Sequence, residues 1–156
     1  MPDQAYFYNQ AGQAVAAVHL GMKVRHVGGD PAARPTDIAL PRGDTKARLI
    51  LALTGLAAER KGAGSSSPLR RNRNRARIAA QLASVMEELK GSEAKRRAQA
   101  ATLRAQAQDR ANAICANLYP AIKVIAETLA EKGVVAGEEV ELAVAETKGR
   151  KGPGID

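Results

Sequence analysis

The chain has 156 residues, of which 45% are hydrophobic and only 3% aromatic, and its formal net charge is +8. These values fit one folded domain with a core of Ala, Leu, Val and Ile. The single cysteine excludes an intrachain disulfide, and neither a signal peptide nor an apolar run of about 18 residues is present. We therefore expect a cytoplasmic protein, not membrane-bound, whose charge attracts polyanions or acidic protein surfaces.

The first predicted helix covers residues 5–21, and three of its amides follow the spacing of the zinc-protease signature H-E-x-x-H. In that signature two His at i and i+4 bind Zn²⁺, and the Glu is the general base. The corresponding residues here are Asn9, Gln10 and Gln13. A carboxamide is a weak zinc ligand and is not basic near neutral pH. We therefore predict no zinc, no cofactor and no hydrolysis.

The sequence around this motif resembles the peptidase domain of FtsH-type proteases, the membrane AAA+ zinc proteases. Residues 8–17 read Y-x-x-A-G-x-A-V-x-A, and residues 53–59 are similar to the family's L-x-G-R-A-A-E helix. Residues 117–140 are similar to the helical end of that domain, so the resemblance covers roughly residues 5–145. It implies a metalloprotease-like helical domain and, because the family forms hexamers, self-association.

Both histidines follow the motif closely in the chain. His19 does not share a helix face with Gln13 at ligand spacing, and His26 lies in a strand-like stretch at residues 23–27. We expect structural roles for both. Residues 28–45 carry closely spaced Gly and Pro, which predicts a loop or a broken edge strand. This segment is either a plain connector or a peptide-binding edge.

The second predicted helix covers residues 45–61, with Asp44 or Thr45 as its cap. The resemblance places Glu59 near the first helix, where it would hydrogen-bond Asn9 in support of the motif. The alternative is a surface glutamate beside the basic residues that follow it.

The third predicted helix begins at Ser67 and Pro68, after a flexible loop at residues 62–67. Its first turns are strongly basic, and cations there oppose the helix macrodipole. An anion or acidic partner would compensate this charge; solvated arginines are the alternative. The cluster consists of Arg70, Arg71, Arg73, Arg75 and Arg77.

The resemblance also implies a third ligand position in this helix. FtsH-type members carry an Asp near its start, four residues before an Ala. Counting back from Ala76 places Asn72 there, to within one or two residues. The ligand and base positions would then all carry amides, which predicts a polar but uncharged pocket.

The helical pattern from residue 76 to residue 115 breaks at Gly91, and Ser92 is a suitable cap for its second half. Cys115 occupies an apolar position, so we expect it in the core.

The last predicted helices cover residues 117–132, with Gly133 as the stop, and residues 137–146. Residues 148–156 are predicted to be a disordered tail, which leaves a folded domain at residues 1–147. Together the patterns predict an all-α domain, mainly a helical bundle, which can include one short β-hairpin or edge strand after the first helix.

Three functions follow from these patterns. The first is an inactive pseudo-peptidase that serves as a protein-binding or assembly module. The second is a basic protein that binds nucleic acid or another polyanion through phosphates, weakly and without sequence preference. The third is an active zinc peptidase with unusual ligands such as His19 or His26.

Overall fold

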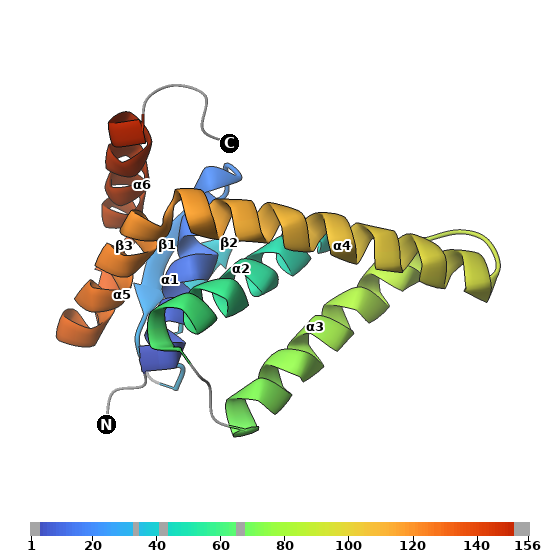
Figure 1. The fold of residues 1–156 in the computed structure, drawn as a ribbon. Helices are drawn as coiled ribbons and strands as arrows, with labels where there is room; N and C mark the ends of the chain where they lie inside the picture. The colour runs from blue at the N-terminus through green and yellow to red at the C-terminus, as the bar shows by residue number, and fades with distance from the viewer. Residues whose placement is uncertain (1–3, 33–34, 41–43, 65–67, 152–156) are drawn as a thin grey trace.

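The computed structural model describes residues 4–32, 35–40, 44–64 and 68–151, and it is mainly helical (Figure 1). Within these ranges six α-helices accompany one small sheet. The elements in chain order are α1 (Gln4–His19), β1 (Lys23–Gly28), β2 (Asp37–Ala39), α2 (Thr45–Ala63), α3 (Pro68–Glu88), α4 (Glu93–Asn117), α5 (Tyr119–Lys132), β3 (Val134–Ala136) and α6 (Gly137–Lys151).

Helix α1 lies at the centre of the molecule and packs against α2, α5, α6 and β1. A helix that is apolar around most of its circumference is a core helix, and Ala11, Val15 and Ala16 are all fully buried. Helix α2 approaches α1 very closely, because a Cβ added at Gly12 would lie 2.8 Å from the Cβ of Ala58. The predicted core of small aliphatic residues is confirmed, and Cys115 belongs to it.

The sheet has three antiparallel strands in the order β2-β1-β3. The edge strand predicted after the first helix is β2. We did not predict β3, which pairs with β1 so that Val135 lies opposite Val27. Three apolar residues after Gly133 carry no sign of the distant strand they join, which is why β3 was not predicted. The mainly helical character of the prediction is confirmed.

Helix α3 is attached to α2 at both ends. Near the start of α2, the Thr45 hydroxyl donates to Glu88 at the end of α3 over 2.9 Å. Near the end of α2, Glu59 contacts the first turns of α3. Helices α3 and α4 meet at a projecting tip and diverge toward α2 (Figure 1).

Several predicted helix ends are confirmed. Asp44 accepts a hydrogen bond from the Ala47 amide, and Ser92 accepts one from the Lys95 amide. Gly133 ends α5 in the left-handed conformation at φ 77°. The predicted cap Ser67 lies outside the described residues. Helix α6 continues to Lys151, past the end at residue 146 that was predicted for the last helix. Residues 152–156 of the predicted disordered tail lie outside the described residues.

Across the described ranges, no single helix is long and apolar enough to cross a membrane. Helices α4 and α5 together are long and apolar enough for a span by length and composition, but the pair is bent by 76° at the break between the two helices.

Tyr8 joins α1 to α2 and α5. Its ring stacks on Tyr119 with centroids 6.4 Å apart, and a Cβ at Gly62 would lie 2.1 Å from it. Burial, and next the neighbouring Tyr119, raise the pKa of Tyr8 from 10.0 to about 12. Since the unfolded chain releases this proton near pH 10 and the folded chain holds it to about 12, stability should fall with rising pH across this window.

We expect the tyrosinate absorbance of the native protein to contain one component that titrates near pH 12, and expect Tyr8→Phe to remove it. A Tyr8→Phe titration curve that keeps this late component would contradict the assignment.

Candidate functional site

The candidate site begins with two amides one turn apart on α1. Gln13 Nε2 donates to Asn9 Oδ1 over 2.7 Å, and Asn9 is only 2% exposed. Gly55 of α2 lies directly against this pair, because a Cβ there would be 2.7 Å from Asn9 Oδ1. The two side chains at the signature's ligand positions are therefore bonded to each other and covered by a neighbouring helix.

Gln10, at the position of the general base, lies where two adjoining cavities meet. One, of about 460 Å³, is also lined by Asn9, Arg70 and Asn74. The other, of about 480 Å³, is also lined by Gln13. Gln10 is 8% exposed, so its amide lies at the inner wall of both cavities. It offers a hydrogen-bond donor and an acceptor there, but no basic atom.

Glu59 is fully buried and does not lie at the surface beside Arg60, which excludes the surface alternative. Arg70 Nε donates to its Oε1, and Asn74 Nδ2 donates to its Oε2 over 2.7 Å. Both carboxylate oxygens are thus bonded to α3. The expected hydrogen bond to Asn9 is replaced by these two contacts, because α3 lies closer to the carboxylate than the sequence indicated.

Asn74, two residues after the predicted Asn72, is the asparagine of α3 that lines the cavity beside Asn9. Asn72 is exposed and does not line either cavity. Asn74 lines the cavity of about 460 Å³ together with Asn9. Residues two apart on a helix point in different directions, so Asn72 and Asn74 cannot both face this cavity. The pocket is also charged rather than uncharged, because it contains Arg70.

The arginines of α3 divide between two sides of the helix. Arg70, Arg73 and Arg77 line the cavity beside α1. Arg71 and Arg75 line a different cavity, which α2 and α4 share. Spacings of three and four residues place each set on one helix face. The five arginines predicted as one cluster therefore form two groups, on two different faces of α3.

The histidines lie apart from the amides. His19 is in the last turn of α1, and His26 Nε2 lies 2.8 Å from the Pro35 carbonyl oxygen in the sheet region. Within the part of the chain that the structure describes, no three His, Cys, Asp or Glu side chains are grouped as metal ligands.

The side chains at the signature positions do not fit zinc. Asn9 and Gln13 offer neutral amide groups, and the Asn9 oxygen already accepts a hydrogen bond. The charged residues that line the cavity beside Asn9 are three arginines, Arg70, Arg73 and Arg77, and one acid, Asp30. This excess of positive charge would repel a metal cation, so the residues present do not fit a metal site.

No protein-family model matches this chain, and no curated protein matches it.

Sequence reasoning missed Asn74 and the role of Arg70. One signal was available, because Arg70, Asn74 and Arg77 recur at helical spacing. An asparagine flanked by arginines reads as surface, however, until a buried carboxylate is known to face it.

Proposed function

We propose that this chain is an inactive relative of FtsH-type peptidases that binds an extended polypeptide segment without cutting it. One observation carries the proposal. The cavity of about 480 Å³, which we call the peptide groove, joins Gln10 and Gln13 of the signature to the edge strand β2. A peptide lying in this groove would contact both.

The edge strand supports a particular mode of binding. Strand β2 is at the edge of the sheet formed by the described residues. An extended peptide can add to such an edge through main-chain hydrogen bonds, while pockets beside the strand receive alternate side chains. Ile38 and Leu40 line the groove on the strand side, and Leu51 and Ala52 line it from α2. The groove therefore offers an apolar lining for peptide side chains.

The charges of the groove favour acidic peptides. Arg48 and Arg77 line it, and in the part of the chain that the structure describes no acidic side chain does. Complementary charge increases the association rate and excludes basic partners. We therefore expect a preference for unfolded segments that carry acidic residues next to apolar ones.

The absence of hydrolysis follows from the amides. Peptide hydrolysis by a zinc enzyme needs an activated water and a group that accepts its proton. Gln10 cannot accept that proton, and Asn9 and Gln13 are bonded to each other. A bound peptide would be retained and released unchanged.

The test uses the groove wall on α3. Gln81 lines the groove, whereas Ala83 is an exposed residue of the same helix outside it. Because the chain contains no Trp, a single introduced Trp also reports binding by its fluorescence. We expect fluorescein-labelled unfolded casein to bind saturably to the native chain. Gln81→Trp should weaken binding by about tenfold by filling the groove, and Ala83→Trp should leave it unchanged.

The same samples test hydrolysis and the alternatives. Casein should remain intact with added zinc, and mass spectrometry should find no stoichiometric zinc in protein purified without chelators. Cleavage would support the active-peptidase alternative, and loss of binding in both Trp variants or neither would contradict groove binding. A DNA fragment that competes fully with casein would support the polyanion alternative.

The assembly role is tested separately by light scattering of the free chain. A ring-sized mass would support self-association through the peptidase-like domain, as the resemblance implies. A monomeric mass would restrict the proposal to peptide binding.

A further inference from the structure

A third cavity, of about 650 Å³, lies on the other side of α3, in the wedge between α2, α3 and α4. One part of its wall is apolar and consists of Leu56, Ile78 and Leu82. Ile78 and Leu82 belong to a small core cluster that joins the three helices, so this wall is a continuation of the core. The volume lies within the range of roughly 300–1,000 Å³ that is usual for sites of small organic ligands.

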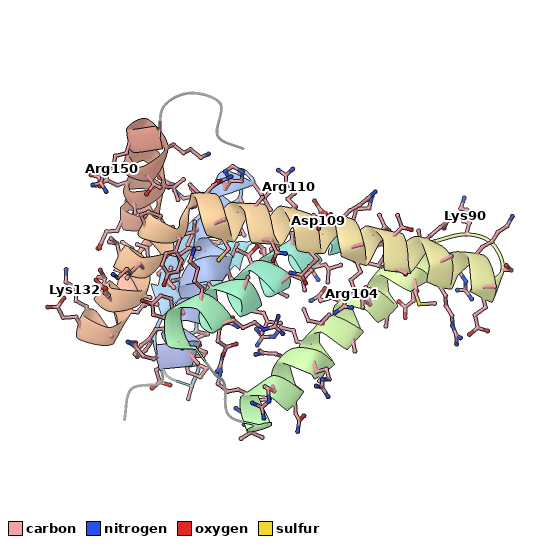
Figure 2. All side chains as sticks on the ribbon, viewed as in Figure 1. Lys90, Arg104, Asp109, Arg110, Lys132 and Arg150 are labelled. Atoms are coloured by element: carbon pink, nitrogen blue, oxygen red, sulfur yellow. The ribbon has the colours of Figure 1, made fainter. Side chains whose placement is uncertain are left out.

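The other part of the wall is basic. Four arginines from all three helices line the cavity, and none of the described residues that line it is acidic. Figure 2 shows Arg104 on the side of α4 that faces α3, whereas Arg110 points away from α3. Among the described residues, Arg60, Arg75 and Arg104 take part in no ion pair.

The nearest buried carboxylate does not neutralise this charge. Both oxygens of Glu59 are bonded to Arg70 and Asn74. Asn74, which is bonded to Glu59, also lines this cavity. The ion pair between Glu59 and Arg70 therefore lies between the cavities on the two sides of α3. Helix α3 also has no acid in its first turn, where its macrodipole favours negative charge. The charges of the arginines and the positive end of the α3 macrodipole therefore both act on one partly apolar cavity.

We propose that this cavity binds an amphipathic organic anion. The carboxylate or phosphate head lies among Arg75, Arg104 and Arg60, and the apolar body lies against Leu56 and Leu82. Arginine is suited to such heads because its guanidinium forms paired, charge-assisted hydrogen bonds with them. A bare inorganic anion would leave the apolar wall in water, and an uncharged apolar molecule would leave Arg60, Arg75 and Arg104 without a counter-charge. The site is independent of the peptide groove.

The test is calorimetric titration of the full chain with monomeric decanoate. We expect saturable binding by the native protein. Arg104→Gln should weaken it by about tenfold, because one charge-assisted contact is lost. Arg110→Gln, an exposed arginine on the same helix, should change it by less than about twofold. Both substitutions are at exposed positions, and circular dichroism checks that the helices remain.

Three ligands separate the contributions of head and body. Hexanoate should bind at least about tenfold more weakly than decanoate, because fewer methylenes are buried. Decanol and inorganic phosphate should each bind far more weakly than decanoate. Equal losses in Arg104→Gln and Arg110→Gln, or decanol binding as tightly as decanoate, would overturn the proposal.

Vesicles of phosphatidylglycerol distinguish a free anion from a membrane surface. Vesicles that compete with decanoate and lose affinity in Arg104→Gln would show that the same site also accepts lipid heads. Binding to vesicles without any binding of monomeric decanoate would overturn the proposal in favour of a membrane-surface interaction.

Discussion

Replacing Arg70 with Met is expected to lower the free energy of unfolding by about 3–5 kcal/mol, because it leaves a buried carboxylate without its cation. The Glu59 side chain is fully buried, and that of Arg70 is only 16% exposed, so water cannot replace the guanidinium. Asn74 would remain as a neutral donor to one oxygen. Chemical denaturation followed by circular dichroism measures the change.

The control for this prediction is Arg73→Met, because Arg73 is an exposed arginine of the same helix. Its effect should stay within about 0.5 kcal/mol. The double variant Glu59→Gln/Arg70→Met should be more stable than Arg70→Met by about 1–3 kcal/mol, because no buried charge remains. Equal effects of Arg70→Met and Arg73→Met would contradict the buried ion pair.

The Glu59 ion pair matters to both proposed sites, because α3 forms a wall of each. Gln81 faces the peptide groove, and Ile78 and Leu82 face the arginine-lined cavity. The contacts of α3 with α2 and α4 help to place these faces. In Arg70→Met we therefore expect both casein and decanoate to bind more weakly, whereas Gln81→Trp should affect casein alone.

Gly137→Ala is expected to cost about 3 kcal/mol or more, at or above the upper end of the usual range for overpacking. Gly137 is the first residue of α6, and a Cβ there would lie 1.8 Å from the Val24 carbonyl oxygen. That oxygen belongs to the main chain of the central strand β1, so it cannot turn away as a side chain could. Either α6 or the strand must shift. Thermal and chemical denaturation both measure the loss.

Gly149→Ala is the matched control, because Gly149 lies in the same helix and a Cβ there would meet nothing within 4 Å. It should stabilise the protein by up to about 1 kcal/mol through the higher helix propensity of Ala. The two glycine variants should therefore change stability in opposite directions. A neutral or stabilising Gly137→Ala would show that α6 does not pack against β1 at this distance.

The sequence was sufficient to predict most of the helices and several of their ends. Ser92 and Gly133 act through a side chain or a backbone conformation within one turn of the chain, so they function as they would in an isolated segment. The arrangement of the amides of α1 is also local. Their spacing alone placed Asn9 and Gln13 one turn apart, within hydrogen-bond reach.

What the sequence by itself determined was therefore local: the helices, their caps, the excess of positive charge and the identity of the amides. The tertiary structure alone decided that Glu59 is buried, that Asn74 rather than Asn72 faces inward, and that residues 134–136 form a strand. It also decided which arginines of α3 face each cavity. These features depend on which face of an element meets another element, and that is fixed by packing between segments far apart in the chain.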